Sequence, residues 1–108
     1  MPRFWWERRD DPQYMALGRA WNASAPNPET SAAMSWANPN VVAFHANLLA
    51  SALHSASWEG VELDLLRTAH YFPPSTPRAA RAGVMRAFIA SVRAALPAGA
   101  ALGLRFSL

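Results

Sequence analysis

Apolar residues recur at helical spacing in three parts of the chain, and the first part follows Asp11. Leu17 and Trp21 share one helical face there. Asp11 followed by Pro12 is a typical helix start, because aspartate caps the first turn and proline lacks only an N–H that has no partner at this position. The pattern predicts a helix over residues 12–21.

The longest apolar stretch begins at Asn38 and Pro39, which repeat this start signal. Its apolar side chains cover much of the circumference of a helix, which is typical of a helix at the centre of a fold. They are Val41, Val42, Phe44, Leu48, Leu49, Leu53, Val61, Leu65 and Leu66. We predict a central helix over 39–70, or a pair of helices divided near Gly60, ended before Pro73.

The third stretch begins after Pro77 and is stopped by Pro97. Its apolar stripe consists of Met85, Phe88, Ile89, Val92 and Leu96. Arg86 and Arg93 are seven residues apart and share another face. The pattern predicts a basic amphipathic helix over 78–96.

The segments between these helices contain no regular apolar period. Residues 1–11 form an aromatic and charged arm, 22–38 form a connector rich in Pro, Ala and Ser, and 97–108 form a tail that is extended or a last short turn. A length of 108 residues suits one domain, 1–108. The expected fold is all-α, with three or four helices in an open, small bundle, Pro-rich connectors and extended termini.

The charged residues are few and unevenly placed. The chain is 52% hydrophobic and only 16% charged, against roughly 25% charged in an ordinary soluble domain. All ten basic residues are arginine. Residues 1–64 hold four of them and all seven acids, whereas residues 65–108 hold six and no acid. This asymmetry indicates an anionic partner for the second half, because arginine binds carboxylate and phosphate through two parallel hydrogen bonds.

The residue types that carry catalysis do not converge in the sequence. The absence of cysteine excludes disulfides, Cys-ligated metals and thiol catalysis. His45 and His54 are nine apart, on nearly opposite faces of a helix, which disfavours a metal site. Ser57, His54 and Asp64 could be drawn as a triad, but no nucleophile elbow accompanies them. We therefore expect no enzyme activity, no metal, no cofactor and no small-molecule substrate.

The chain also offers little that would place it in a membrane or outside the cell. Residues 41–58 are free of formal charge and reach the lower length limit of a membrane span, but His45, Asn47 and His54 within them favour a core helix. Acidic residues lie within the first dozen positions, unlike a secretory signal or a transit peptide. We expect an intracellular protein that is not secreted.

Tryptophan and arginine together supply the candidate binding residues, because both are enriched at protein–protein hot spots and tryptophan at membrane interfaces. Five tryptophans are many for this length. The candidates for partner binding are Trp5, Trp6, Arg8, Arg9, Trp36, Arg81, Arg86 and Arg93. An alternative is that Trp5 and Trp6 fold back onto the helices of their own chain.

These features favour a non-catalytic accessory subunit that packs on larger protein subunits. The particular expectation is an organellar assembly of the respiratory or ATP-synthase type, with a mitochondrial, membrane-associated location and peripheral contact with anionic lipid as an option. One alternative is a small phage or bacterial inhibitor or adaptor that binds one target protein. Another is a nucleic-acid-associated basic protein, which is less favoured because the arginines are sparse and the aromatics lie mostly in the other half.

Overall fold

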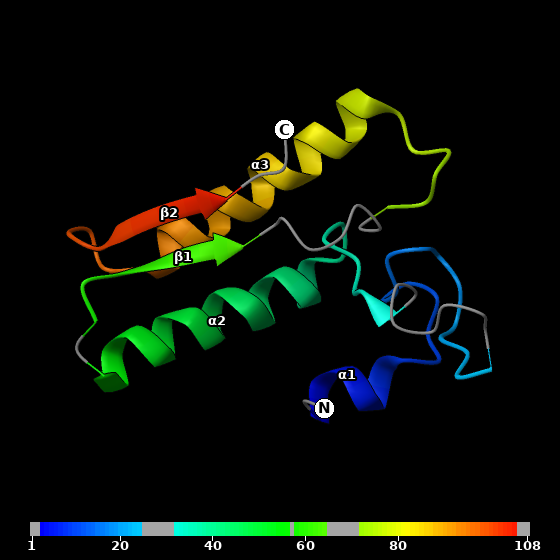
Figure 1. Cartoon of the computed structure of the whole chain (residues 1–108), viewed down its shortest axis with the longest axis horizontal. Coiled ribbons are helices and arrows are strands. Elements are labelled where there is room, and N and C mark those ends of the chain that lie inside the picture. The colour runs from blue at the N-terminus through cyan, green and yellow to red at the C-terminus, as the bar shows by residue number, and fades with distance from the viewer. Residues whose placement is uncertain (1–2, 25–31, 57, 65–71, 106–108) are drawn as a thin grey trace.

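The computed structural model describes residues 3–24, 32–56, 58–64 and 72–105. Along the chain it contains α1 (Arg3–Arg8), α2 (Pro39–Ala56), β1 (Gly60–Asp64), α3 (Arg78–Ala95) and β2 (Ala101–Arg105), shown in Figure 1. The two strands pair in parallel, from Gly60 beside Ala101 to Asp64 beside Arg105. The expectation of an all-α fold was therefore wrong, because the described residues form a mixed α/β structure.

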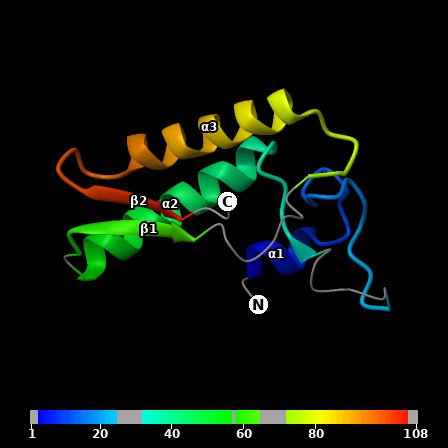
Figure 2. The ribbon, with the colours of Figure 1, turned by 45° about the horizontal axis from the view of Figure 1, so that its top comes forward.

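The strands and α3 form a β–α–β unit, in which α3 is the crossover that two parallel neighbours require. Helix α2 lies alongside α3 (Figures 1 and 2). One cluster of buried residues consists of Leu53 from α2 and Phe88, Val92 and Leu96 from α3 and its end, and Val61, Leu63 and Leu102 of the strands pack against it. The helices thus cover one face of the sheet, and the core lies between the two layers.

The other face of the sheet is polar. Glu62 and Asp64 alternate with the apolar residues of β1, and Arg105 ends β2. The Arg105 Nε lies 3.6 Å from the Glu62 Oε1 across the two strands. This period of two is what a sheet with one packed and one exposed face requires.

Both alternatives for 39–70, one helix or a pair divided near Gly60, were wrong, because α2 ends at Ala56 and a strand, β1, follows at Gly60. Residues 65–70 lie outside the described ranges. Strand β1 pairs with β2, which lies in the tail. The tail was expected to be extended or a last short turn, and residues 101–105 of it are extended. Gly60 permits this pairing, since a Cβ atom at this position would lie 2.4 Å from the carbonyl oxygen of Ala101. A tertiary contact therefore ends the helical region.

The helix predicted over 12–21 is also absent. This segment instead consists mainly of turns, and Met15 forms an isolated antiparallel bridge with Met34. The N–H of Ala16 donates to the carbonyl of Ala33 at 2.8 Å. Because the bridge occupies backbone groups that a helix would use internally, Ala33, Met34 and Ser35 of the connector hold the segment in a non-helical form.

Helix α3 coincides with the helix predicted over 78–96 to within one residue. Helix α2 contains most of the uncharged stretch 41–58. Across the described ranges, neither α2 nor any other helix combines the length and the apolar character needed to cross a membrane.

Candidate functional site

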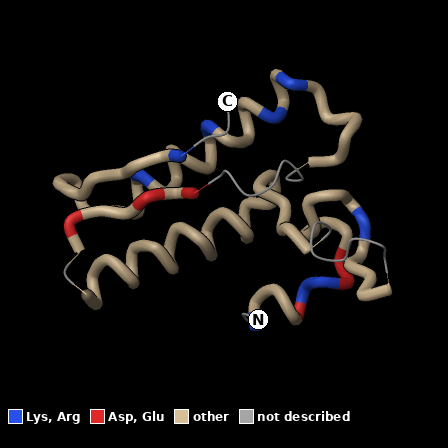
Figure 3. Tube along the Cα trace, viewed as in Figure 1, with Lys and Arg blue, Asp and Glu red and all other residues tan. Residues whose placement is uncertain are grey.

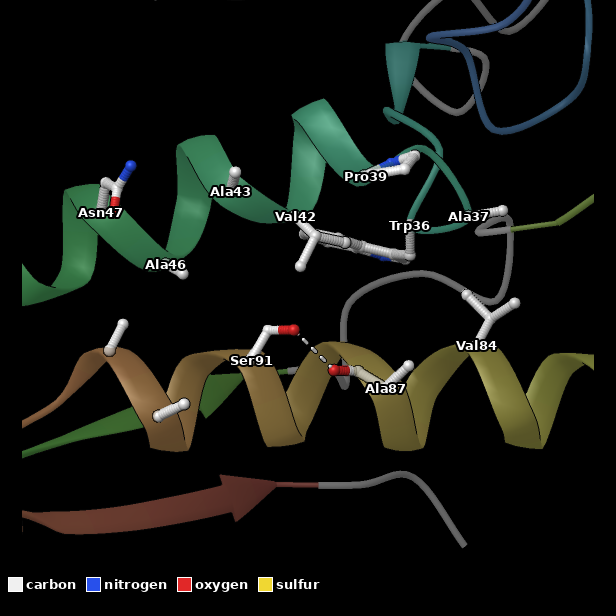
Figure 4. Close-up of a pocket in the computed structure, with 12 residues that line it drawn as sticks. Trp36, Ala37, Pro39, Val42, Ala43, Ala46, Asn47, Val84, Ala87 and Ser91 are labelled. Carbon is white, nitrogen blue, oxygen red and sulfur yellow. Dashed lines mark hydrogen bonds between the residues drawn. The ribbon is translucent and has the colours of Figure 1, made fainter.

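An open groove of about 620 Å³ runs between α2 and α3. Figure 4 shows its lining side chains on the two helices, with β1 passing behind α3 and β2 on the side of α3 away from α2. The α3 residues that line the groove differ from Phe88, Val92 and Leu96, the α3 residues of the core cluster beneath which the sheet lies. Helix α2 lines it with Val42, Ala43, Ala46 and Asn47, and α3 lines it with Val84, Ala87, Ser91, Ala94 and Ala95. We call this feature the α2–α3 groove.

Small side chains make the groove. Ala43 and Ala46 of α2 and Ala87 and Ala94 of α3 are among its lining residues, and alanine ends at Cβ, so little side-chain volume separates the two backbones from the opening. None of the lining residues carries a formal charge. The surface is therefore suited to apolar contact at short distance from the helix backbones.

Trp36 lies at the end of the groove near Pro39 (Figure 4). Its ring centroid is 4.3 Å from that of Phe88 and 4.9 Å from that of His45. The Nδ1 of His45 is in turn 2.9 Å from the carbonyl oxygen of Val41, one helical turn earlier. Trp36, a predicted partner residue, is thus held by contacts within its own chain and forms one end of the groove.

The polar side chains of the groove offer no reactive group. The Ser91 hydroxyl donates to the Ala87 carbonyl at 2.9 Å, the dashed line in Figure 4. Asn47 projects from α2 away from α3 in the same view. The lining beside these two side chains contains no acidic residue, no histidine and no arginine.

The predicted N-terminal arm is partly a helix, α1, and Trp5 is buried within its own chain, with 6% of its surface exposed. Its Nε1 donates to the carbonyl of Ala32 at 2.7 Å, and its ring meets that of Trp21 edge-on at 5.3 Å. Trp6 is half exposed and stacks under the Arg9 guanidinium. The alternative of folding back therefore describes Trp5, whereas Trp6 remains accessible.

Helix α1 packs on α2 through aromatic rings. Phe4 stacks on Phe44 with a centroid distance of 4.1 Å and nearly parallel planes. The Arg8 guanidinium lies 3.9 Å from the Phe4 centroid, and Arg8 also donates to the Phe4 carbonyl at 3.1 Å. Arg8, a predicted partner residue, thus stabilises the attachment of α1.

The arginines of α3 differ in their environment. Arg81 and Arg86 are exposed, and no ion pair involves either of them among the described residues. Arg93 is half-buried and donates to the carbonyls of Ala100 at 2.7 Å and Pro97 at 2.9 Å, which ties the end of α3 to the turn before β2. Figure 3 shows cations along α3, and this helix contains no acidic residue.

The structure does not unite the predicted partner residues in one site. The N-terminal ones lie in α1 and directly after it, those of α3 lie along the crossover helix, and among the predicted residues only Trp36 lines the groove. Sequence reasoning missed the groove alanines and the exposed Leu48 and Trp58. The recurrence of alanine at helical spacing, at Ala87 and Ala94 for example, was the available signal, but such a stripe is equally typical of a buried contact between helices.

In the parts of the chain that the structure describes, no three metal-ligating side chains gather into a possible metal site. No protein-family model matches the chain, and neither a curated protein nor a solved structure gives a significant match.

Proposed function

We propose that the protein is a non-catalytic subunit that packs against a larger protein through the α2–α3 groove. The observation that carries this proposal is an open, uncharged groove of about 620 Å³ lined mostly by alanine and valine. Apolar surface of this kind is stabilised when a partner covers it. The low charged fraction of the chain, 16%, supports the same conclusion.

A helix of the partner is the occupant that suits the groove. Packed helices approach to interaxial distances of about 8–10 Å, with the shorter distances where the contacting side chains are small. Ala46 and Ala87 supply such side chains on the two walls. Because the lining is uncharged, the partner helix would present an apolar stripe to it, as in other helix-in-groove complexes.

The setting proposed for this subunit is the organellar, respiratory or ATP-synthase-type assembly expected from the sequence, with a mitochondrial location. The exposed Arg81 and Arg86 support contact with carboxylates of neighbouring subunits or with anionic lipid at its edge. The inhibitor or adaptor alternative would use the same groove, and it differs in having one target protein rather than several neighbours.

The test compares two alanine positions of α3. Ala87→Leu adds volume inside the groove, whereas Ala90→Leu makes the same change at an exposed position outside the lining. The tagged wild type and the two variants, expressed in the source cells, are analysed by size-exclusion chromatography with mass measurement. We expect the wild type and Ala90→Leu to elute in a larger complex and Ala87→Leu to elute without it. A wild type that elutes alone, or a complex that Ala87→Leu leaves intact, would contradict the proposal.

A photo-reactive residue at position 94 adds a direct readout. Ala94 lines the groove, so cross-linked peptides should come from one helical segment of the partner. Cross-links spread over many unrelated proteins would also argue against a defined occupant.

A further inference from the structure

Strand β2 has an outer edge without a pairing strand in the part of the chain that the structure describes, where the sheet consists of β1 and β2 (Figure 1). The backbone N–H of Ala101 donates to the backbone carbonyl oxygen of Glu59, the residue before β1, at 3.0 Å. In a strand, the N–H and C=O of one residue point to the same edge, and those of the next residue point to the opposite edge. The backbone groups of Leu102 and Leu104 therefore point to the outer edge.

We propose that a second copy of this chain pairs with this edge, and that the two β2 strands run antiparallel about a twofold axis at Gly103. In this register Leu102 of each copy lies opposite Leu104 of the other. The backbone N–H of each of these residues donates to the carbonyl oxygen of the residue opposite it. The two Gly103 residues meet at the axis as a non-hydrogen-bonded pair, the position where the backbones come closest. The result is one continuous four-stranded sheet. This surface is separate from the α2–α3 groove, so the inference goes beyond the function proposed above.

The apolar side chains support this pairing. Leu102 packs against the core cluster, and Leu104 lies on the same face of the strand but is 36% exposed. Antiparallel pairing at Gly103 sets Leu102 of the second copy directly beside Leu104. The dimer would therefore cover a leucine that the single chain leaves partly open, and would extend the apolar face beneath the helices.

The charges also favour this edge over the edge of β1. On the polar face, the proposed register places Arg105 opposite Ala101 of the second copy, so no like charges face each other, and Arg105 keeps its partner Glu62 in its own chain. A dimer centred on β1 would instead set the two Glu62 side chains opposite each other. Like charges directly opposite destabilise a strand pair.

Strand β2 also lacks the features that protect an edge from pairing. Residues 101–105 contain no proline and no lysine, and their register with β1 is continuous, without a bulge. Arg105, the one charged residue of β2, lies at its end. An edge with these properties is a template for another strand.

The test changes the charge at one exposed residue. In the proposed dimer, Ala101→Glu faces Arg105 of the second copy, and Ala101→Arg faces the same arginine with like charge. Two symmetry-related pairs of opposite charge should tighten dimerisation by about 2- to 30-fold, and two like pairs should weaken it by a similar factor. Sedimentation velocity from micromolar to near-millimolar protein measures the three dissociation constants at low salt.

A backbone variant provides the second measurement. Leu104→Pro removes an N–H that faces the outer edge and that the β1–β2 ladder does not use, so proline is compatible with the single chain there. Circular dichroism checks that its helix content equals that of the wild type. We expect dimerisation to be lost. Leu104→Ala is the control, since it shortens the side chain but retains the N–H, and it should weaken the dimer less than Leu104→Pro.

The outcomes separate cleanly. A wild type that stays monomeric at all concentrations overturns the inference, and so does a dimer whose dissociation constant is the same for Ala101→Glu and Ala101→Arg. A dimer that responds to Ala87→Leu and not to the Ala101 variants would place self-association in the α2–α3 groove and likewise overturn it. Loss of a larger complex with Ala87→Leu bears only on the proposed function.

Discussion

Replacement of Gly60 by alanine tests the close approach that joins β1 to β2. A Cβ atom at this position would lie 2.4 Å from the carbonyl oxygen, 2.9 Å from the carbonyl carbon and 2.8 Å from the Cβ of Ala101. Two of these three atoms belong to the backbone, so no side-chain rotation relieves the overlap. The strands must move apart where their pairing begins.

The magnitude follows from two opposing effects. Overpacking of a well-packed contact costs about 1–3 kcal/mol. Loss of glycine's freedom in the unfolded chain returns about 0.4–1 kcal/mol. We therefore expect Gly60→Ala to lower the free energy of unfolding by about 1 kcal/mol and by no more than about 2.6 kcal/mol, a large share of the stability of a small domain.

Gly83 provides a matched control with the opposite sign. It lies inside α3, its φ is not positive, and an added Cβ would meet nothing within 4 Å. Alanine is better than glycine in a helix by about 1 kcal/mol, so Gly83→Ala should raise the free energy of unfolding. Urea denaturation followed by circular dichroism and tryptophan fluorescence measures both variants. A Gly60→Ala protein as stable as the wild type would refute the close contact between the strands.

Two further predictions concern polar contacts of the predicted partner residues. Arg93→Lys should lower the free energy of unfolding by about 1 kcal/mol, because one ammonium group cannot serve the carbonyls of Pro97 and Ala100 in the geometry of the guanidinium; urea denaturation and faster amide exchange in the turn before β2 would show it. Trp5→Phe should cost a similar amount by removing the bond to the Ala32 carbonyl, whereas Trp6→Ala should stay within about 0.5 kcal/mol. If Trp5→Phe and Trp6→Ala lowered the free energy of unfolding equally, the conclusion that Trp5 is buried and Trp6 is exposed would be contradicted.

Local periodicity accounts for the helices that were predicted well. In α3, the apolar stripe around Phe88 and Val92 and the prolines on both sides determine the helix and its ends without help from the rest of the chain. The start of α2 follows in the same way from Asn38 and Pro39. These signals lie within one or two turns of the residues they control, so a sequence pattern contains them in full.

The N-terminal region shows where local signals fail. Asp11 and Pro12 form a good helix start, yet the chain turns there, because the bridge between Met15 and Met34 competes for the same backbone groups. Trp5 and Trp6 are adjacent and chemically identical, but a rotation of about 100° per residue along a helix buries one and exposes the other. Only the packing of α1 decides which one is available to a partner.

The sequence by itself therefore determined α3, the start of α2, a low charged fraction and the uneven placement of cations and acids along the chain. The tertiary structure alone decided that Gly60–Asp64 and Ala101–Arg105 are strands, that α2 and α3 share a groove and that β2 has an open edge. The physical reason is that a helix satisfies its hydrogen bonds within a few residues, whereas a parallel strand pair depends on a distant segment brought back by a crossover. A five-residue alternation becomes a strand only when that partner is in place.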